Sequence, residues 1–421
     1  MVVPEELLTK AHHRIMDHLP TKHIPQDETH APNNVYARIL ERYTGGLKPA
    51  LHHTTSPNNM QAPVQVGLIG SQFISSIHAE ALLACPHAQL AAVASPTPGN
   101  ARQLAARLGI PRAFTDYREL LAHPGIRMVV VGVPNHLHCQ VVIDSAAAGK
   151  HIVIEKPFCL NLGEADRMIE ACRAANVKLM YAEELCFAPK YVRLKQLLDS
   201  GALGHPTLLK QSEKHDGPHA AHFWDVERSG GGVTMDMGCH AIEFFRWMLG
   251  RPPIKSVYAQ MSTQVHGDKT RGDDNAIIIL EFADGVIAIA EESWTKLGGM
   301  DDRAEVHGSG GVAYADLLHG SAIETYSVGG YDYAVEKAGS TKGWSFTIFE
   351  EAWNYGFHQE MAHFVDCVQN DKPPLVTGED GRAVLEVIFA AYESARSGRK
   401  IELPFHTTAA RPIDLWQPRG Q

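Results

Sequence analysis

Three polar residues have the types and the spacing that oxidation of an alcohol requires. Lys156 follows the strand-like stretch HIVI, and Asp236 and His240 stand four residues apart in GGGVTMDMGCH. Removing a hydride from a carbinol requires a base within hydrogen-bond reach of the hydroxyl, and a cation can stabilise the developing alkoxide. Residues four apart on a helix, or on its first turn, share one face. A structural cap beside a buried histidine would give the same spacing, but Lys156 upstream favours catalysis by these three residues.

A second stretch, VGLIGSQFISSIHAEAL, has the pattern of the glycine turn that opens a dinucleotide-binding unit. In G-x-G-x-x-G the glycines make the bend, admit the pyrophosphate and let the helix pack on the strand. Gly70 keeps the first position, whereas Gln72 and Ser75 occupy the others. A helix N-terminus still offers free N–H groups to a phosphate. We therefore expect NAD or NADP to bind at Gly70, Gln72, Phe73 and Ile74, with loss of cofactor binding as the alternative.

Two further segments bear on the cofactor. The second strand-like run ends at Ser95, where NAD-specific units carry a carboxylate for the ribose. Ser95 tolerates a 2′-phosphate, and Arg102 could reach one or be a solvated helix residue, so the choice between NAD and NADP stays open. VPNHLH places Pro134, Asn135 and His138 at the carboxyl edge of the predicted sheet, where open α/β folds bind ligands. For His138, a purely structural place at a helix N-terminus is the alternative.

The stretch EKHDGPHAAHFWD gathers several histidines and a tryptophan within thirteen residues. Such a cluster of His215, His219 and His222 could bind a metal, but its spacing matches no familiar zinc site. We expect no metal and predict a polar loop that hydrogen-bonds hydroxyl groups and stacks on a sugar ring. A solvated loop is the plain alternative. The predicted substrate-binding residues are Lys156, His215, His219, Trp224, Asp236 and His240.

The elements around these residues indicate two different sheets. From Val64 strand-like and helical runs alternate, which is typical of a doubly wound parallel sheet. After Leu203 longer strands alternate apolar with polar residues, as in a sheet with one covered face. We predict an α/β protein with an N-terminal Rossmann domain and a C-terminal α+β domain built on an open-faced mixed β-sheet. The expected divisions are an arm at 1–62, the Rossmann domain at 63–187, a substrate-binding and oligomerisation domain at 188–405 whose final helices pack back on the Rossmann domain, and a tail at 406–421.

The arm itself is polar and rich in histidine and proline, with helical patterns at 4–18 and 34–43. Val35, Ile39 and Leu40 have helical spacing, so part of the arm is expected to pack, and it could lie across a neighbouring subunit. A disordered tail is the alternative.

Composition excludes several classes of protein. The 421 residues carry 48 acidic and 38 basic side chains, a net charge of −10, which provides no basic stripe for nucleic acid. Seven widely spaced cysteines without a C-x-x-C pair indicate reduced thiols. The N-terminus has no apolar targeting segment, so we expect a cytoplasmic protein without a membrane partner. Apolar strands on an open sheet face favour a homo-oligomer, either a dimer or a tetramer.

Four motifs resemble those of the Gfo/Idh/MocA oxidoreductases, the group that contains glucose-fructose oxidoreductase and inositol dehydrogenase. They are GLIGSQFISSIHAEAL, VPNHLHCQVVIDSAAAGKHIVIEKP, GGGVTMDMGCHAIEFFRWMLG and FVDCVQNDKPPLVTGEDGRAVLEVIFAAYESARSGRKIEL. Glu243 departs from the family pattern D-x-G-x-H-x-x-D at its last position. The resemblance implies that Glu155 and Lys156 lie at the cofactor, that His240 is the general base, and that Asp236 and Lys156 bind substrate hydroxyl groups.

These observations predict an NAD(P)-dependent oxidoreductase that oxidises a secondary hydroxyl of a carbohydrate, polyol or glycoside by hydride transfer to nicotinamide. A redox glycosidase, in which transient ring oxidation permits elimination of the aglycone, is one alternative. A non-catalytic NAD(P)-binding sensor is another. Loss of the polar residues at 156, 236 and 240 would have indicated a sensor, and all three are present.

Overall fold

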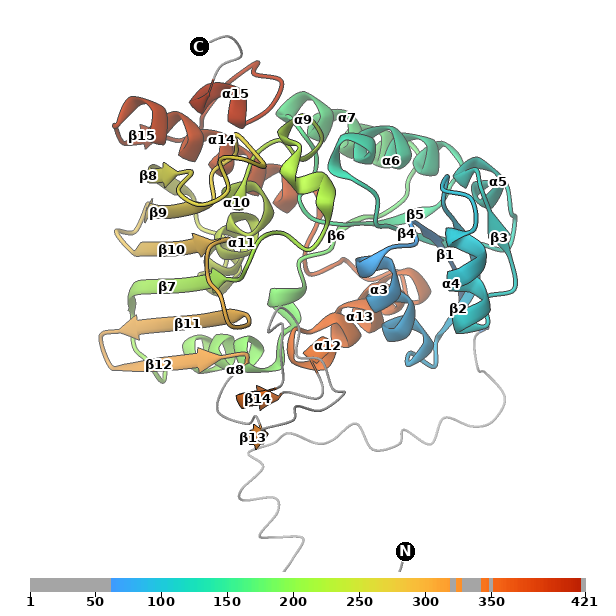
Figure 1. Cartoon of the computed structure of the whole chain (residues 1–421), viewed down its shortest axis with the longest axis horizontal. Coiled ribbons are helices and arrows are strands. Elements are labelled where there is room, and N and C mark those ends of the chain that lie inside the picture. Colours follow the sequence, from blue (N-terminus) through green and yellow to red (C-terminus); the bar gives the residue numbers. More distant parts are fainter. Residues whose placement is uncertain (1–61, 319–322, 328–341, 348–350, 418–421) are drawn as a thin grey trace, which may run out of the picture. The chain divides into compact units, whose positions relative to one another are not determined.

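Short apolar strands form a six-stranded parallel sheet in the first part of the chain (Figure 1). The computed structural model describes residues 62–318, 323–327, 342–347 and 351–417, so the predicted arm and its helices at 4–18 and 34–43 lie outside the described residues. The strands are β1 (Val64–Ile69), β2 (Ala88–Ala94), β3 (Ala113–Phe114), β4 (Met128–Val131), β5 (His151–Ile154) and β6 (Leu179–Tyr181). Their order, β3-β2-β1-β4-β5-β6, confirms the predicted doubly wound sheet.

Helices connect these strands. They are α3 (Phe73–Leu83), α4 (Asn100–Leu108), α5 (Tyr117–Leu121), α6 (His138–Ala147) and α7 (Leu162–Ala174), with the 3-10 turn η1 (Asn135–Leu137) before α6. Polar side chains cap two of them, because Asp116 accepts a hydrogen bond from the N–H of Arg118 and Asn161 accepts one from the N–H of Glu164. Since β1 lies between β2 and β4, the loops after β1 and β4 diverge at the switch point where open α/β sheets bind ligands.

Longer strands of alternating burial form the second sheet, in the order β12-β11-β7-β10-β9-β8-β15. They are β7 (Pro206–Lys214), β8 (Ile254–Ser262), β9 (Asn275–Phe282), β10 (Ile287–Ser293), β11 (Asp301–Gly308), β12 (Gly311–Asp316) and β15 (Ile401–Glu402). β7 and β10 run parallel, whereas the other neighbours run antiparallel. The sheet is mixed, as predicted, but the edge strands β12 and β15 were not expected. A separate pair joins β13 (Ile323–Ser327) to β14 (Gly343–Thr347).

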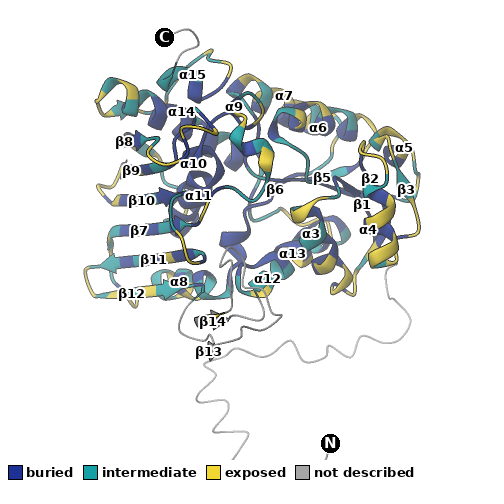
Figure 2. Ribbon diagram, viewed as in Figure 1, coloured by how far each residue is buried: buried dark blue, intermediate teal, exposed yellow. Residues whose placement is uncertain are grey.

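Helices cover one face of the second sheet. α10 (Val233–Asp236) and α11 (Gly238–Met248) contact β10, and α14 (Gly378–Ser397) contacts β8 and α7. α13 (Phe357–Gln369) contacts α3, so each of the last two long helices touches a helix of the first sheet. α10 and almost all of α11 are buried (Figure 2). The remaining elements are η2 (Glu184–Phe187), α8 (Pro189–Asp199), η3 (Ala221–Trp224), α9 (Val226–Ser229), α12 (Glu351–Asn354) and α15 (Ile413–Trp416).

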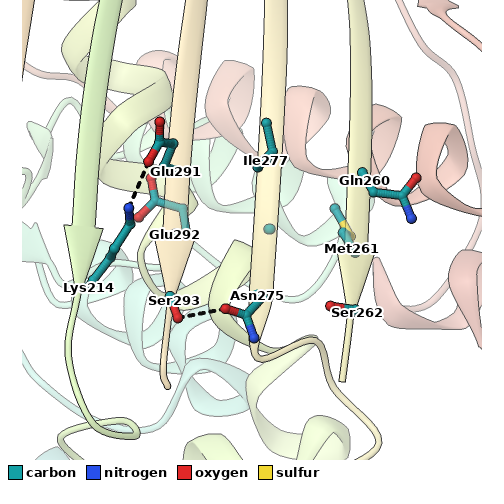
Figure 3. Close-up of a pocket in the computed structure, with 10 residues that line it drawn as sticks. Lys214, Gln260, Met261, Ser262, Asn275, Ile277, Glu291, Glu292 and Ser293 are labelled. Atoms are coloured by element: carbon teal, nitrogen blue, oxygen red, sulfur yellow. Dashed lines mark hydrogen bonds and ion pairs between the residues drawn. The ribbon is translucent and has the colours of Figure 1, made fainter. Parts of the chain in front are cut away.

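The opposite face of the second sheet carries exposed apolar side chains. They come from four strands and are Tyr258, Ile277, Ile287, Val312 and Tyr314. A hollow on the sheet lies across β7 to β10, where Lys214 pairs with Glu291 at 2.7 Å and Ser293 donates a hydrogen bond to Asn275 (Figure 3). None of the residues predicted to act in chemistry lines this hollow.

All seven cysteines lie in the described part of the chain, where each is buried and unpaired. Among the described helices, none is both long and apolar enough to cross a bilayer.

Candidate active site

The turn after β1 keeps the geometry of a phosphate-binding turn with a single glycine. Gly70 has φ +121°, and a Cβ atom at this position would lie 2.2 Å from the carbonyl oxygen of Gly132. Any other residue would therefore clash with the loop after β4 and adopt a strained backbone. Close packing at the third position survives because Ser75 is small and buried against Gly132.

Gln72 does not block this turn. It is exposed and forms the N-cap of α3, which begins at Phe73. The first N–H groups of a helix have no intrahelical partner and attract anions. The buried hydroxyl of Ser71 has no hydrogen-bond partner among the described residues and can also donate. The turn therefore fits a dinucleotide pyrophosphate without the second glycine.

The other predicted cofactor residues differ in how they are held. Ser95 follows β2 and is buried, whereas Arg102 is exposed on α4. The amide of Asn135 donates to the carbonyl of Ser229 at 2.6 Å. His138 is fully buried, with its ring nitrogens 3.1 and 2.7 Å from two main-chain carbonyl oxygens, and burial lowers its pKa. This geometry favours a role for His138 in holding the loop rather than in touching a ligand.

Lys156 and Asp236 form a buried ion pair at the carboxyl edge of the first sheet. Lys156 follows β5, and its Nζ lies 3.1 Å from both the main-chain oxygen and Oδ1 of Asp236. The indole N–H of Trp294 donates to the other carboxylate oxygen of Asp236 at 3.2 Å. Burial alone would raise the pKa of Asp236, but the charge of Lys156, together with those of His215 and His219, outweighs burial and lowers the pKa to about 2. Both groups are therefore charged at neutral pH.

Asp236 and His240 do not share one continuous helix. Asp236 ends α10, and His240 lies in the first turn of α11, which begins at Gly238. The two helices are separated by Met237, so the expected helical spacing is not the reason that the side chains converge. Both are nevertheless buried, and the charges of Asp236 and Lys156 act on His240.

A carboxylate that the sequence did not single out holds His240. Its Nδ1 lies 2.5 Å from Oε1 of Glu183, and its Nε2 lies 3.8 Å from Oε1 of Glu184. Burial lowers the pKa of His240 to about 4 and raises that of Glu183 to about 8. The imidazole is therefore neutral near pH 7, and the Glu183 contact decides which ring nitrogen carries the proton.

Sequence reasoning missed Glu183 and Glu184, although a signal was present. YAEEL places two carboxylates directly after β6, at the same edge of the sheet where Lys156 follows β5. The adjoining Glu155 contacts His78 Nε2 at 2.5 Å and accepts a hydrogen bond from the main-chain N–H of Lys156. Helix α3 and the segments after β5 and β6 therefore bring acids and bases to one edge of the first sheet.

The histidine loop touches the cofactor turn. Phe73 stacks on His219 with ring centroids 5.1 Å apart, and His219 meets His215 edge-on at 4.7 Å. Trp224 packs edge-on against Trp294, the tryptophan that binds Asp236. The structure thus connects the predicted substrate loop with both the cofactor turn and the ion pair.

Metal binding has one geometric candidate among the described residues, formed by Glu183, Cys239 and His240. The contact of 2.5 Å between Glu183 and His240 is a hydrogen bond, because two ligands of one ion bound at about 2.0 to 2.1 Å lie farther apart in tetrahedral geometry. The histidines of the loop do not form such a group of three.

Glu243, the departure from the family pattern, has a structural place. It lies on α11 and forms ion pairs with Arg246 and Arg251, and both arginines also pair with Asp380 of α14. This network connects two helices of the covered face and does not reach the Lys156 ion pair.

The Rossmann sheet with its phosphate turn, joined to helices α10 and α11 that contribute Asp236 and the buried His240, defines a dinucleotide-dependent oxidoreductase. Residues 64–183 match the description "Oxidoreductase family, NAD-binding Rossmann fold", and residues 195–403 match "Oxidoreductase family, C-terminal alpha/beta domain". The chain belongs to the Gfo/Idh/MocA oxidoreductase family.

Relatives extend over both sheets. Myo-inositol 2-dehydrogenase of Thermotoga maritima is 29% identical, covering 81% of this chain and 98% of the relative. Scyllo-inositol 2-dehydrogenase (NAD(+)) of Bacillus subtilis is 31% identical, covering 82% and 97%. The crystal structure of GenD2 from gentamicin A biosynthesis in complex with NAD is 33% identical, with a TM-score of 0.78 over 82% of this chain and 98% of that chain.

Proposed function

We propose that this NAD(P)-dependent oxidoreductase oxidises a secondary hydroxyl group of a sugar or polyol, with His240 as the general base. The observation that carries the proposal is the His240–Glu183 contact beside the Lys156–Asp236 ion pair, at the edge of the sheet that also carries the phosphate turn. Two relatives are inositol dehydrogenases, which supports an alcohol substrate with several hydroxyl groups. These names favour neither a redox glycosidase nor a sensor.

A nicotinamide dinucleotide held by the turn after β1 would supply the hydride acceptor. The ammonium of Lys156 donates a hydrogen bond to the reacting oxygen and stabilises the alkoxide as it develops. Nε2 of His240 takes the hydroxyl proton, while ionised Glu183 accepts a hydrogen bond from Nδ1–H and stabilises the imidazolium that forms. Asp236 holds the ammonium of Lys156 in place. We retain His215, His219 and Trp224 as proposed substrate contacts, because their loop reaches both the cofactor turn and Trp294.

The residues that we propose to hold the dinucleotide follow successive parallel strands. They are Gly70, Gln72, Phe73, Ile74, Ser95, Pro134, Asn135, Glu155 and Lys156, with His138 acting through the loop that it supports. We also keep the division into a cofactor domain at 63–187 and a substrate domain at 188–405, because each contains one sheet. A cytoplasmic location is supported by the seven unpaired cysteines.

The proposal is tested with His240→Ala and a screen of sugars and inositols, using NAD and NADP and following absorbance of the reduced nicotinamide. We expect the turnover number to fall by about 10² to 10⁴, the usual contribution of a general base. Glu170→Gln, at an exposed position on α7, is the matched control. A folded His240→Ala protein with wild-type turnover would move the base elsewhere, and Lys156 would be tested next.

We further propose that the open face of the second sheet joins two copies of the chain in a dimer or tetramer. Five large apolar side chains are exposed on it, and Tyr314 alone is 69% exposed. Ile277→Asp at the middle of this face should lower the mass measured by light scattering. A mass equal to one chain for the wild-type protein would refute the assembly.

A further inference from the structure

Carboxylates cross the helix-covered face of the second sheet side by side. The strand register places Asp302 of β11 opposite Glu213 of β7, and Glu213 opposite Glu292 of β10. All three residues are buried. Directly opposed side chains have Cβ atoms about 5 Å apart, and like charges in this arrangement destabilise a sheet. This row of acids requires an explanation.

Protein groups satisfy only part of the row. Asp302 accepts hydrogen bonds from the hydroxyl of Tyr191 and the amide of Gln211. Glu213 is 5% exposed, and its Oε2 has no hydrogen-bond partner among the described residues. Burial, reinforced by the charges of Asp302 and Glu292, raises the pKa of Glu213 well above its ordinary range. Without a ligand, this carboxyl therefore keeps its proton near neutral pH.

Glu213 lies next to the proposed catalytic residues. It lies near the end of β7, two residues before the buried His215, whose charge acts on Asp236. Two residues along a strand are about 7 Å apart, which is within the dimensions of a sugar-binding site. Lys156 and Glu184 are both among the charged groups that act on Glu213. The unpartnered oxygen therefore belongs to the region around Lys156.

A second carboxyl approaches the same region from the first sheet. Glu184 follows β6, is buried, and its Oε1 lies 3.8 Å from Nε2 of His240. Lys156 is the one lysine or arginine among the groups that act most strongly on Glu184 and Glu213. Its ammonium is already paired with Asp236 at 3.1 Å. Around Lys156 the carboxyl groups outnumber the positively charged side chains, so the site lacks positive charge.

A bound metal ion is not suited to supply this missing positive charge. The only group of three potential ligands among the described residues contains neither Glu184 nor Glu213. An ammonium group on the substrate fits better, because it donates charge-assisted hydrogen bonds to separate carboxylates without requiring them to converge on one point.

We propose that Glu184 and Glu213 receive an ammonium group of the substrate, so that the alcohol oxidised at His240 is an amino sugar or an aminocyclitol. This inference rests on the proposed function, which supplies the alcohol and the hydride acceptor. A neutral hydroxyl in place of the ammonium would leave Glu213 without a counter-charge. Binding of the ammonium lets this carboxyl ionise and releases its proton to solvent.

The test compares substrates that differ in one substituent. The full-length protein is assayed with NAD and with NADP on glucosamine against glucose, and on scyllo-inosamine against scyllo-inositol. We expect kcat/KM to be at least about tenfold higher for an amine than for its neutral counterpart, because hydrogen bonds to charged groups are the stronger ones. Glu213→Gln should abolish this preference and should melt at no lower temperature, because the amide replaces a carboxyl that is already uncharged in the absence of a ligand. Glu170→Gln should keep it.

Equal or better turnover of the neutral members overturns the inference and leaves the proposed function intact. The same holds if Glu213→Gln and Glu184→Gln both keep the wild-type preference. If no compound reduces the cofactor, the proposed function fails, and calorimetry of glucosamine with NAD-loaded protein decides the inference separately. Binding that needs Glu213 and releases a proton supports it, and absence of such binding refutes it.

Discussion

Replacing Glu183 with glutamine tests how His240 is prepared to accept a proton. The substitution keeps the shape of the side chain but removes the negative charge that faces Nδ1 at 2.5 Å once the carboxyl has ionised, above about pH 8. A hydrogen bond to a charged group contributes about 1.5 to 3 kcal/mol, against about 0.5 to 1.5 kcal/mol for a neutral pair. The imidazolium that forms during oxidation therefore loses about 1 to 2 kcal/mol, and kcat should fall about 5- to 30-fold. KM should change little, because Glu183 is fully buried and does not face the substrate.

The pH profile separates this role from a structural one. Burial raises the pKa of Glu183 to about 8, so below that pH the carboxyl is protonated and donates to Nδ1. The imidazole proton then lies on Nε2, which cannot act as a base. The oxidation rate of the wild-type protein should rise as the pH approaches this value. In Glu183→Gln the rise should move to lower pH, because the ionisation of Glu184, with a pKa of about 7, then controls the rate.

The assay is initial-rate oxidation from acid to alkaline pH, with Glu170→Gln as a control for the loss of a carboxylate elsewhere on the protein. Melting temperature is measured on the same samples to confirm folding. Unchanged kcat together with an unchanged pH profile would refute the reasoning, because it would show that His240 does not depend on the charge of Glu183.

Three further predictions concern binding and stability. Gly70→Ala should abolish dinucleotide binding in calorimetry, because its Cβ atom would lie 2.2 Å from a main-chain oxygen, and retained affinity would contradict the fit of the turn. Gln72→Gly should change that affinity by less than about tenfold, since main-chain N–H groups make most phosphate contacts. Burial raises the pKa of Glu184 and Asp302 to about 7, so their contribution to stability is complete below about pH 4 and is lost as the pH rises through about 7. The melting temperature should fall over that interval, and a constant value would contradict the assignment.

The first sheet could be predicted from the sequence because its strands are short apolar runs that alternate with helices. Helix boundaries are harder to predict: α3 begins at Phe73, and Gln72 before it is not a usual capping residue and gives no signal of the helix start. The edge strand β12 was missed because it begins within a glycine pair and is only partly buried. Helix α8, which begins at Pro189, was also not predicted.

The residues of the site could be predicted only where a single stretch of the sequence shows the pattern. Lys156 is recognisable because it follows a buried strand, and Asp236 and His240 because they are near in sequence. The contact between His240 and Glu183 joins residues 57 positions apart, and no local pattern reveals it. A one-residue change of register would move the acids of a strand to its other face, so their alignment depends on the folded sheet.

The buried acids indicate where stability has been exchanged for specificity. Replacing a buried ionic group with an apolar residue of similar volume is often neutral or stabilising, so Glu213 and Glu292 are not explained by the needs of the fold. Exceptions to the rules of packing are expected at functional sites. The ion pairs of Glu243 are different, because arginines compensate that charge and connect two helices. The acids without a counter-charge lie instead towards Lys156 and His240, where a positively charged substrate can supply that counter-charge.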